Sequence, residues 1–90
     1  MSTKRIVNLP PITIEAQRSD GAFVTLTARN MRIDEFAAID EIDKDADRKM
    51  ILPKKLAYVF GGKPEDYSVF DARTAISIFN TFLGEIRNPT

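Results

Sequence analysis

The stretch from Ala72 to Ile86, ARTAISIFNTFLGEI, constrains the fold more than any other part of the sequence. Wound at 100° per residue, it is an amphipathic helix whose apolar residues share one side. These residues are Ala72, Ala75, Ile76, Phe79, Phe82, Leu83 and Ile86, with Ile78 at the margin. The apolar arc spans roughly 160°, wider than the stripe of about 100° that a surface helix usually turns to its core. A face this wide has to be covered, either by the rest of the chain or by another one.

Two interpretations of this face are open. In the first, all of it is core, because the core of a 90-residue chain is thin and a terminal helix often supplies most of it. In the second, Ala75, Ile76 and Phe79 seal the fold, and the end of the helix protrudes into another chain, since exposed apolar patches mark interaction sites. The partner-binding residues would then be Ile78, Phe82, Leu83 and Ile86.

A β-hairpin is expected near the N-terminus. Residues 12–17 and 23–28 both alternate apolar and polar side chains, and Asp20-Gly21 between them is a strong turn signal. Val24, Leu26 and Ala28 share one side of the second strand. Ahead of the hairpin, Arg5 to Leu9 is short and β-prone, and the following prolines confine it to an edge or a strand start. A two-stranded hairpin is marginal alone and needs an apolar surface to lie on.

Three helical segments follow the hairpin. The first spans residues 30–43, and the second begins near Asp45 or Asp47 and ends at Phe60, before Gly61-Gly62. Pro53 inside the second predicts a kink or two shorter helices. A loop with one helical turn at Pro64 comes next, and the last helix runs from about residue 69 to 85 behind an S-x-x-D capping box at Ser68, with residues 87–90 frayed.

The elements together predict a single α+β domain over residues 1–90, with an N-terminal β-hairpin packed on a bundle of about three helices. Its core is expected to include Val24, Leu26, Phe36, Leu56, Val59, Phe60, Ala75 and Phe79.

The composition argues against an enzyme. The chain has no cysteine and no histidine, which removes thiolate chemistry, the commonest general base and the commonest zinc ligand. We therefore expect no catalytic, cofactor-binding or metal site. The 13 basic and 13 acidic residues balance, which disfavours a nucleic-acid partner. No apolar run is long enough to cross a membrane, and the N-terminus lacks the apolar stretch of a signal peptide.

The acidic run DKDAD, residues 43–47, resembles the start of a calcium loop in its alternate carboxylates. The loop requires glycine at its sixth position and glutamate at its twelfth, where this chain has Arg48 and Lys54. Seven of the 13 acidic residues lie between Asp34 and Asp47, and a basic segment follows. We interpret this unevenness as a solvated surface with ion pairs near helix ends, the alternative being a bipolar docking patch.

The order of features resembles that of a known family. The chain starts with "LPPI", continues through a hairpin ending "VTLTAR" and an acidic helix "MRIDEFAAIDEID", and finishes with "LAYVFGGKPEDYSVFDARTAISIFNTFLGEI". This sequence of elements is similar to that of the small tail assembly chaperones of long-tailed bacteriophages, over nearly the whole chain. The resemblance rests on spacing and residue type, not on a catalytic signature.

The resemblance implies a non-enzymatic chaperone that binds the tape-measure protein in the host cytoplasm and is absent from the mature virion. It also implies that a longer, frameshifted form recruits the tail-tube protein, with Thr81-Phe82-Leu83 as the candidate slippage codons. Without its partner, an apolar end of the last helix should also drive self-association into a homo-oligomer. Two alternatives stay open: a structural phage tail or baseplate subunit, and a small regulatory protein-interaction module.

Overall fold

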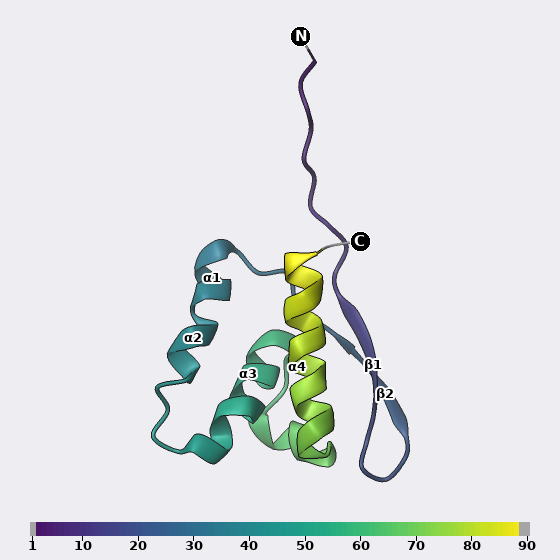
Figure 1. Ribbon diagram of the computed structural model, residues 1–90, viewed down its shortest axis with the longest axis vertical. Coiled ribbons are helices and arrows are strands. Elements are labelled where there is room, and N and C mark those ends of the chain that lie inside the picture. The colour runs from purple at the N-terminus through teal and green to yellow at the C-terminus, as the bar shows by residue number, and fades with distance from the viewer. Residues whose placement is uncertain (1, 89–90) are drawn as a thin grey trace.

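The computed structural model describes residues 2–88 and confirms the α+β class, with an N-terminal hairpin followed by helices. The elements are β1 (Thr13–Gln17), β2 (Phe23–Thr27), α1 (Ile33–Ala37), α2 (Ile39–Ile42), the 3-10 helix η1 (Arg48–Met50), α3 (Ile51–Phe60), the 3-10 helix η2 (Pro64–Val69) and α4 (Ala72–Arg87). Helix α4 stands between the hairpin and the shorter helices (Figure 1).

The hairpin forms as its alternation predicts. The strands pair antiparallel, with Ile14 opposite Leu26 and Ala16 opposite Val24, so one face carries the apolar side chains. The turn is closed by Asp20, whose carboxylate accepts a hydrogen bond from the Ala22 N–H at 3.0 Å. Gly21 supplies the positive φ of 96° that this turn requires.

The segment Arg5 to Leu9, expected as a short strand, is not one. It is extended and projects from the body beyond the start of β1 (Figure 1). Pro10 and Pro11 fix an extended backbone without N–H donors, which carries the segment away from the hairpin.

The helix expected over residues 30–43 is divided into α1 and α2 at Ala38. The Glu41 N–H donates to the Ala38 carbonyl three residues back, and this tighter turn re-aims the chain. As a result Ile39 is buried, whereas Ile33 is 89% exposed.

The break expected at Pro53 falls earlier, between η1 and α3. Helix α3 begins at Ile51, so Pro53 lies in its first turn, where backbone N–H groups have no intrahelical acceptor and the proline ring meets no carbonyl. The helix ends at Phe60 as expected, and the two glycines that follow have φ values of 92° at Gly61 and 78° at Gly62.

The expected capping box at Ser68 is also absent. Ser68 Oγ donates instead to the Glu65 carbonyl at 2.7 Å, within η2, and Asp71 precedes α4 without a side-chain cap bond. Helix α4 therefore starts at Ala72 and continues to Arg87; Pro89 and Thr90 of the expected frayed tail lie outside the described residues.

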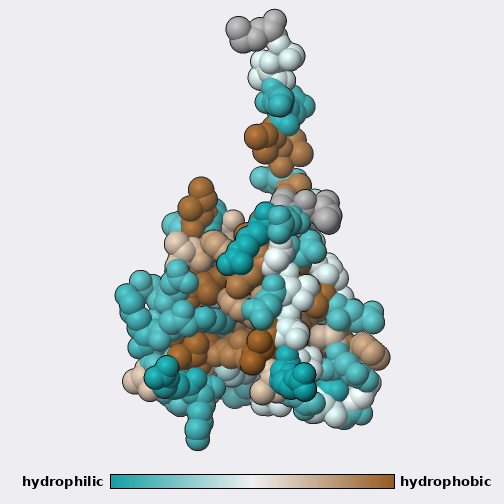
Figure 2. All heavy atoms as spheres, viewed as in Figure 1, coloured by the Kyte–Doolittle hydropathy of each residue, from teal (hydrophilic) through white to brown (hydrophobic). Residues whose placement is uncertain are grey.

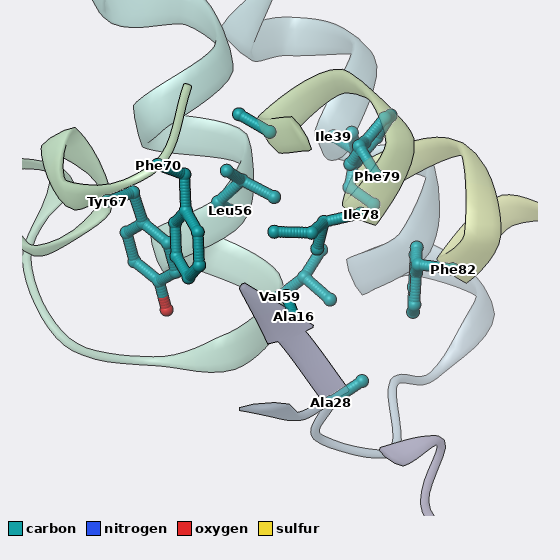
Figure 3. Close-up of a cluster of buried hydrophobic side chains, with 11 residues drawn as sticks. Ala16, Ala28, Ile39, Leu56, Val59, Tyr67, Phe70, Ile78, Phe79 and Phe82 are labelled. Atoms are coloured by element: carbon teal, nitrogen blue, oxygen red, sulfur yellow. The ribbon is translucent and has the colours of Figure 1, made fainter. Parts of the chain in front are cut away.

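The core lies where α4, α3, η2 and the apolar face of the hairpin meet (Figure 3). Of the expected core residues, Leu56, Val59, Ala75 and Phe79 are buried, and Val24, Leu26, Phe36 and Phe60 are half-buried against them. The buried residues not on our expected list are Ala16, Ala28, Ile39, Tyr67, Phe70, Ile78 and Phe82.

Candidate partner-binding surface

The four residues expected to protrude from the last helix do not share one environment. Ile78 and Phe82 are 3% and 1% exposed, so the expectation that they protrude is wrong. Phe82 packs among three rings, with centroid distances of 6.5 Å to Phe36, 6.0 Å to Phe60 and 6.1 Å to Phe79. Ile78 points toward Val59 inside the core (Figure 3).

Leu83 and Ile86 lie nearer the surface, on different flanks of α4. Ile86 is 42% exposed and lines a hollow of about 780 Å³. Leu83 is half-buried and lines a separate hollow of about 300 Å³ beside α1 and α2. Ile76, which was expected to seal the fold, is 49% exposed near the start of the helix. The exposed apolar residues of α4 therefore lie near both its start and its end, whereas the sequence-based interpretation placed them at its end alone.

The larger hollow lies at the end of the body where α4 finishes. Phe82 and Ile86 of α4 form one side, and the connection from β2 to α1 forms another. The projecting segment before β1, residues 4–9, which we call the arm, borders the hollow. Its apolar lining residues are Ile6, Val7, Leu9, Ile12, Ala28, Met31, Ile33, Phe82 and Ile86. Figure 2 shows hydrophobic residues on the arm and near α1 at this end of the molecule. We call this set the apolar hollow.

Arg29 fixes the connection from β2 to α1 that walls the apolar hollow. Its backbone N–H donates to the Val59 carbonyl at 3.0 Å, and its Nε donates to the Tyr58 carbonyl at 2.9 Å. The guanidinium lies 4.5 Å from the Tyr58 ring centroid and pairs with Glu35 at 2.8 Å. Tyr58 in turn donates from its hydroxyl to the Glu35 carbonyl at 2.8 Å. These bonds anchor the wall to α3, so this side of the hollow is formed before any partner arrives.

Glu35 is the charged centre of this anchor. Its carboxylate accepts a hydrogen bond from the Arg32 backbone N–H at 3.0 Å, and this bond, together with the Arg29 guanidinium, lowers the pKa of Glu35 below its ordinary value. Both effects favour the charged form of a carboxylate. Glu35 therefore stays ionised near neutral pH and holds the two arginines in place.

The rim of the apolar hollow is basic. Arg29 and Arg32 line it, and Arg32 is widely exposed with ion-pair distances of 3.5 Å to both Asp34 and Glu35. Ion pairs this exposed contribute little to stability, so Arg32 remains accessible to an acidic partner.

The acidic run at residues 43–47 is occupied by contacts within the chain. Asp43 pairs with Lys55 at 2.6 Å, and Asp45 pairs with Lys54, a contact that lowers the pKa of Asp45. Asp47 accepts from the Lys49 N–H at 3.2 Å and caps η1. Among residues 2–88 no group of three or more acidic side chains is arranged to hold a metal ion. The run therefore ties the α2–α3 connection to α3.

Periodicity alone could not have located the apolar hollow, because six of its nine apolar residues lie outside any helix or strand: Ile6, Val7, Leu9, Ile12, Ala28 and Met31. Comparisons with protein-family models, curated proteins and solved structures gave no match for this chain.

No helix within the described residues has the length and apolar character needed to span a membrane.

Proposed function

We propose that this chain is a non-enzymatic phage tail assembly chaperone that binds helical segments of the tape-measure protein through the apolar hollow. The observation that carries the proposal is a pre-formed apolar surface with isoleucines exposed at its edges, Ile33 by 89% and Ile86 by 42%. A protein that keeps a long helical partner soluble needs apolar surface that its own fold leaves uncovered. The order of hairpin, acidic helix, Gly-Gly break and Phe-Leu helix supports the family.

The hollow suits a helix better than a small molecule. Its volume of about 780 Å³ is shared between the body and the arm, and its lining is dominated by aliphatic side chains with charges at the rim. An amphipathic helix inserts apolar residues from one face into such a groove and leaves its polar face in water. The exposed Arg32 at the rim favours a helix with acidic residues beside its apolar face.

The test is co-purification with fragments of the tape-measure protein, which would be encoded by a very long helical reading frame among the neighbouring genes. Ile86→Asp and Ile33→Asp place a charge in the hollow without touching the buried core, and each should abolish co-purification. Ile76→Asp is the matched control, because Ile76 is equally exposed on the same helix but about 15 Å away along its axis. If all three variants retain the partner, the hollow is not its binding surface.

A second candidate, a structural subunit of the phage tail, is favoured by the projecting arm, since subunits retained in a particle often hold their neighbours through extended segments. Mass spectrometry of purified particles separates the two. A chaperone confined to the host cytoplasm is absent from the particle, whereas a subunit is present in stoichiometric amount. Mass spectrometry of infected cells tests whether a longer frameshifted form accompanies the short one. The longer form is proposed to recruit the tail-tube protein.

A further inference from the structure

The projecting arm, residues 4–9, has the character of a strand without a sheet. Ile6, Val7 and Leu9 are 96%, 65% and 56% exposed. Within the described residues, its link to the body is a hydrogen bond of 3.4 Å from Asn30 Nδ2 to the Leu9 carbonyl. Apolar side chains and free backbone groups together are what an added strand offers to a sheet edge.

The hairpin has an edge of matching length. The hydrogen bonds from Ala28 N–H to the Ile12 carbonyl and from Arg18 N–H to the Ala22 carbonyl show that the even-numbered residues bond across the hairpin. The backbone groups of Phe23, Thr25 and Thr27 therefore point outward from β2. Among residues 2–88 these groups have no hydrogen-bond partner, so the edge is open to another strand.

A separate apolar recess of about 300 Å³ lies along this edge. It is lined by Val24 and Leu26 of β2 and by Tyr67, Val69 and Phe70 of the η2 region, with Arg18 and Asp66 at its rim. The hollow beside β1 is smaller, about 220 Å³, and mixes the apolar residues Ile14, Ala16 and Ile78 with the polar residues Thr74, Ser77 and Thr81 of α4. Within residues 2–88 the β2 edge therefore offers the larger and less polar recess for the side chains of an added strand.

We propose that the arm of one copy adds to the β2 edge of a second copy as a third strand. With Asn8 beside Thr25, Val7 and Leu9 lie next to Val24 and Leu26 and fill the recess, because side chains at the same level in neighbouring strands share a face. Ile6 and Asn8 then face the solvent with Phe23, Thr25 and Thr27. The same side chains of the arm face the recess whether the added strand runs parallel or antiparallel to β2.

The arm cannot reach the β2 edge of its own chain. Pro10 and Pro11 join it directly to β1, which lies on the other side of β2. Crossing two strand spacings takes about 10 Å. The three residue steps from Leu9 to Ile12 span about 10 Å when fully extended, which leaves no slack for turning around the chain that leaves β2.

Charge also favours one direction for the added strand. Lys4 and Arg5 on the arm form no ion pair with the described residues, and neither do Glu65 and Asp66 beside the recess. A parallel strand places Arg5 at the turn end of β2, near Asp66 and near Arg18, whose charge is already paired with Asp20. An antiparallel strand places Arg5 near Arg29, with no unpaired carboxylate of the recess beside it. The parallel arrangement is therefore favoured, and every copy carries both the donor and the acceptor. Because the contact is heterologous, copies join head to tail into rings or chains.

Cross-linking tests the register directly, since the chain has no cysteine of its own. An Asn8→Cys copy is mixed under oxidising conditions with a Thr25→Cys copy that carries a tag to alter its mass. We expect a disulfide-linked heterodimer on a non-reducing gel. The matched control replaces the second copy with Thr13→Cys, an exposed threonine on β1, and should yield none. Equal cross-linking to both positions, or none to Thr25→Cys, would overturn the proposal.

Sedimentation tests the energetic role of the arm. The wild-type chain should form larger species as its concentration rises, and Val7→Asp should sediment as a monomer because its charge enters the recess. Ile6→Asp places the same charge on the solvent face of the same arm and should still assemble. A monomeric wild type, or equal behaviour of the two variants, would contradict strand donation. Because Ile6 and Val7 also line the apolar hollow, the two proposals are separated by Ile86→Asp, which leaves the arm and the β2 edge unchanged. This variant should lose the tape-measure fragment and still assemble, and if the wild type does not assemble, its co-purification test still decides the tape-measure proposal.

Discussion

The ring of Phe82 lies edge-on to that of Phe60, with centroids 6.0 Å apart and planes at 70°. This contact joins the last helix to α3, and it makes Phe82 a structural residue that also lines the proposed binding surface. Edge-to-face geometry is favourable for aromatic pairs beyond the area that they bury.

Phe82→Ala should lower the free energy of unfolding by about 3–5 kcal/mol, because it empties a fully buried aromatic site. Ile86→Ala, one helical turn later, should cost less than about 1 kcal/mol, since its side chain is partly in water. Urea denaturation of both variants measures the difference. Equal losses would place Ile86 in the core and remove it from the binding surface.

Two glycines should respond in opposite ways to alanine. Gly62 has a φ of 78°, and an added Cβ would lie 2.7 Å from a carboxylate oxygen of Asp66, so Gly62→Ala should destabilise the fold by about 1–3 kcal/mol. Gly84 lies inside α4 with no atom near an added Cβ, and Gly84→Ala should stabilise it by about 1 kcal/mol through helix propensity. Thermal melts of the two variants should shift in opposite directions; a shared direction would contradict this backbone assignment.

Acid should weaken the anchor of the hollow through Glu35. Because the pKa of Glu35 in the folded chain lies below its ordinary value of 4.5, its carboxylate contributes stability above that pH, and the contribution is lost as the pH falls through the folded pKa. The Glu35→Gln variant should therefore lose less melting temperature than the wild type between pH 7 and pH 3. Glu15→Gln, at an exposed position on β1, is the control and should follow the wild type. Parallel acid profiles for Glu35→Gln and wild type would show that the carboxylate is not coupled to folding.

Calcium should leave the melting temperature unchanged. The carboxylates of Asp43 and Asp45 are paired with Lys55 and Lys54, so a cation would have to displace both lysines. A ligand that bound the folded state would raise the melting temperature with concentration. Differential scanning calorimetry with and without millimolar calcium checks this, and a calcium-dependent rise would show that the acidic run binds the ion.

The local elements follow from the sequence where a short-range rule decides them. Alternation around Asp20-Gly21 specifies the hairpin and its apolar face, and Gly61-Gly62 ends α3 because both residues adopt positive φ. The rule fails at Pro53, because whether a proline kinks a helix depends on where the helix begins, and η1 delays that start to Ile51. The division of α1 from α2 at Ala38 has no sequence signal, because no glycine or proline lies there.

The sequence by itself determined that α4 has an apolar arc too wide for a surface helix, and only the tertiary structure decided how that arc is used. Helical periodicity fixes the angles between side chains but not what lies opposite them. Packing against α3 and the hairpin buries Ile78 and Phe82, while Ile76 and Ile86 extend past the elements that cover the rest. The apolar hollow arises in the same way, because residues of the arm, the β2–α1 connection and α4 are far apart in the chain and come together only when the helix docks.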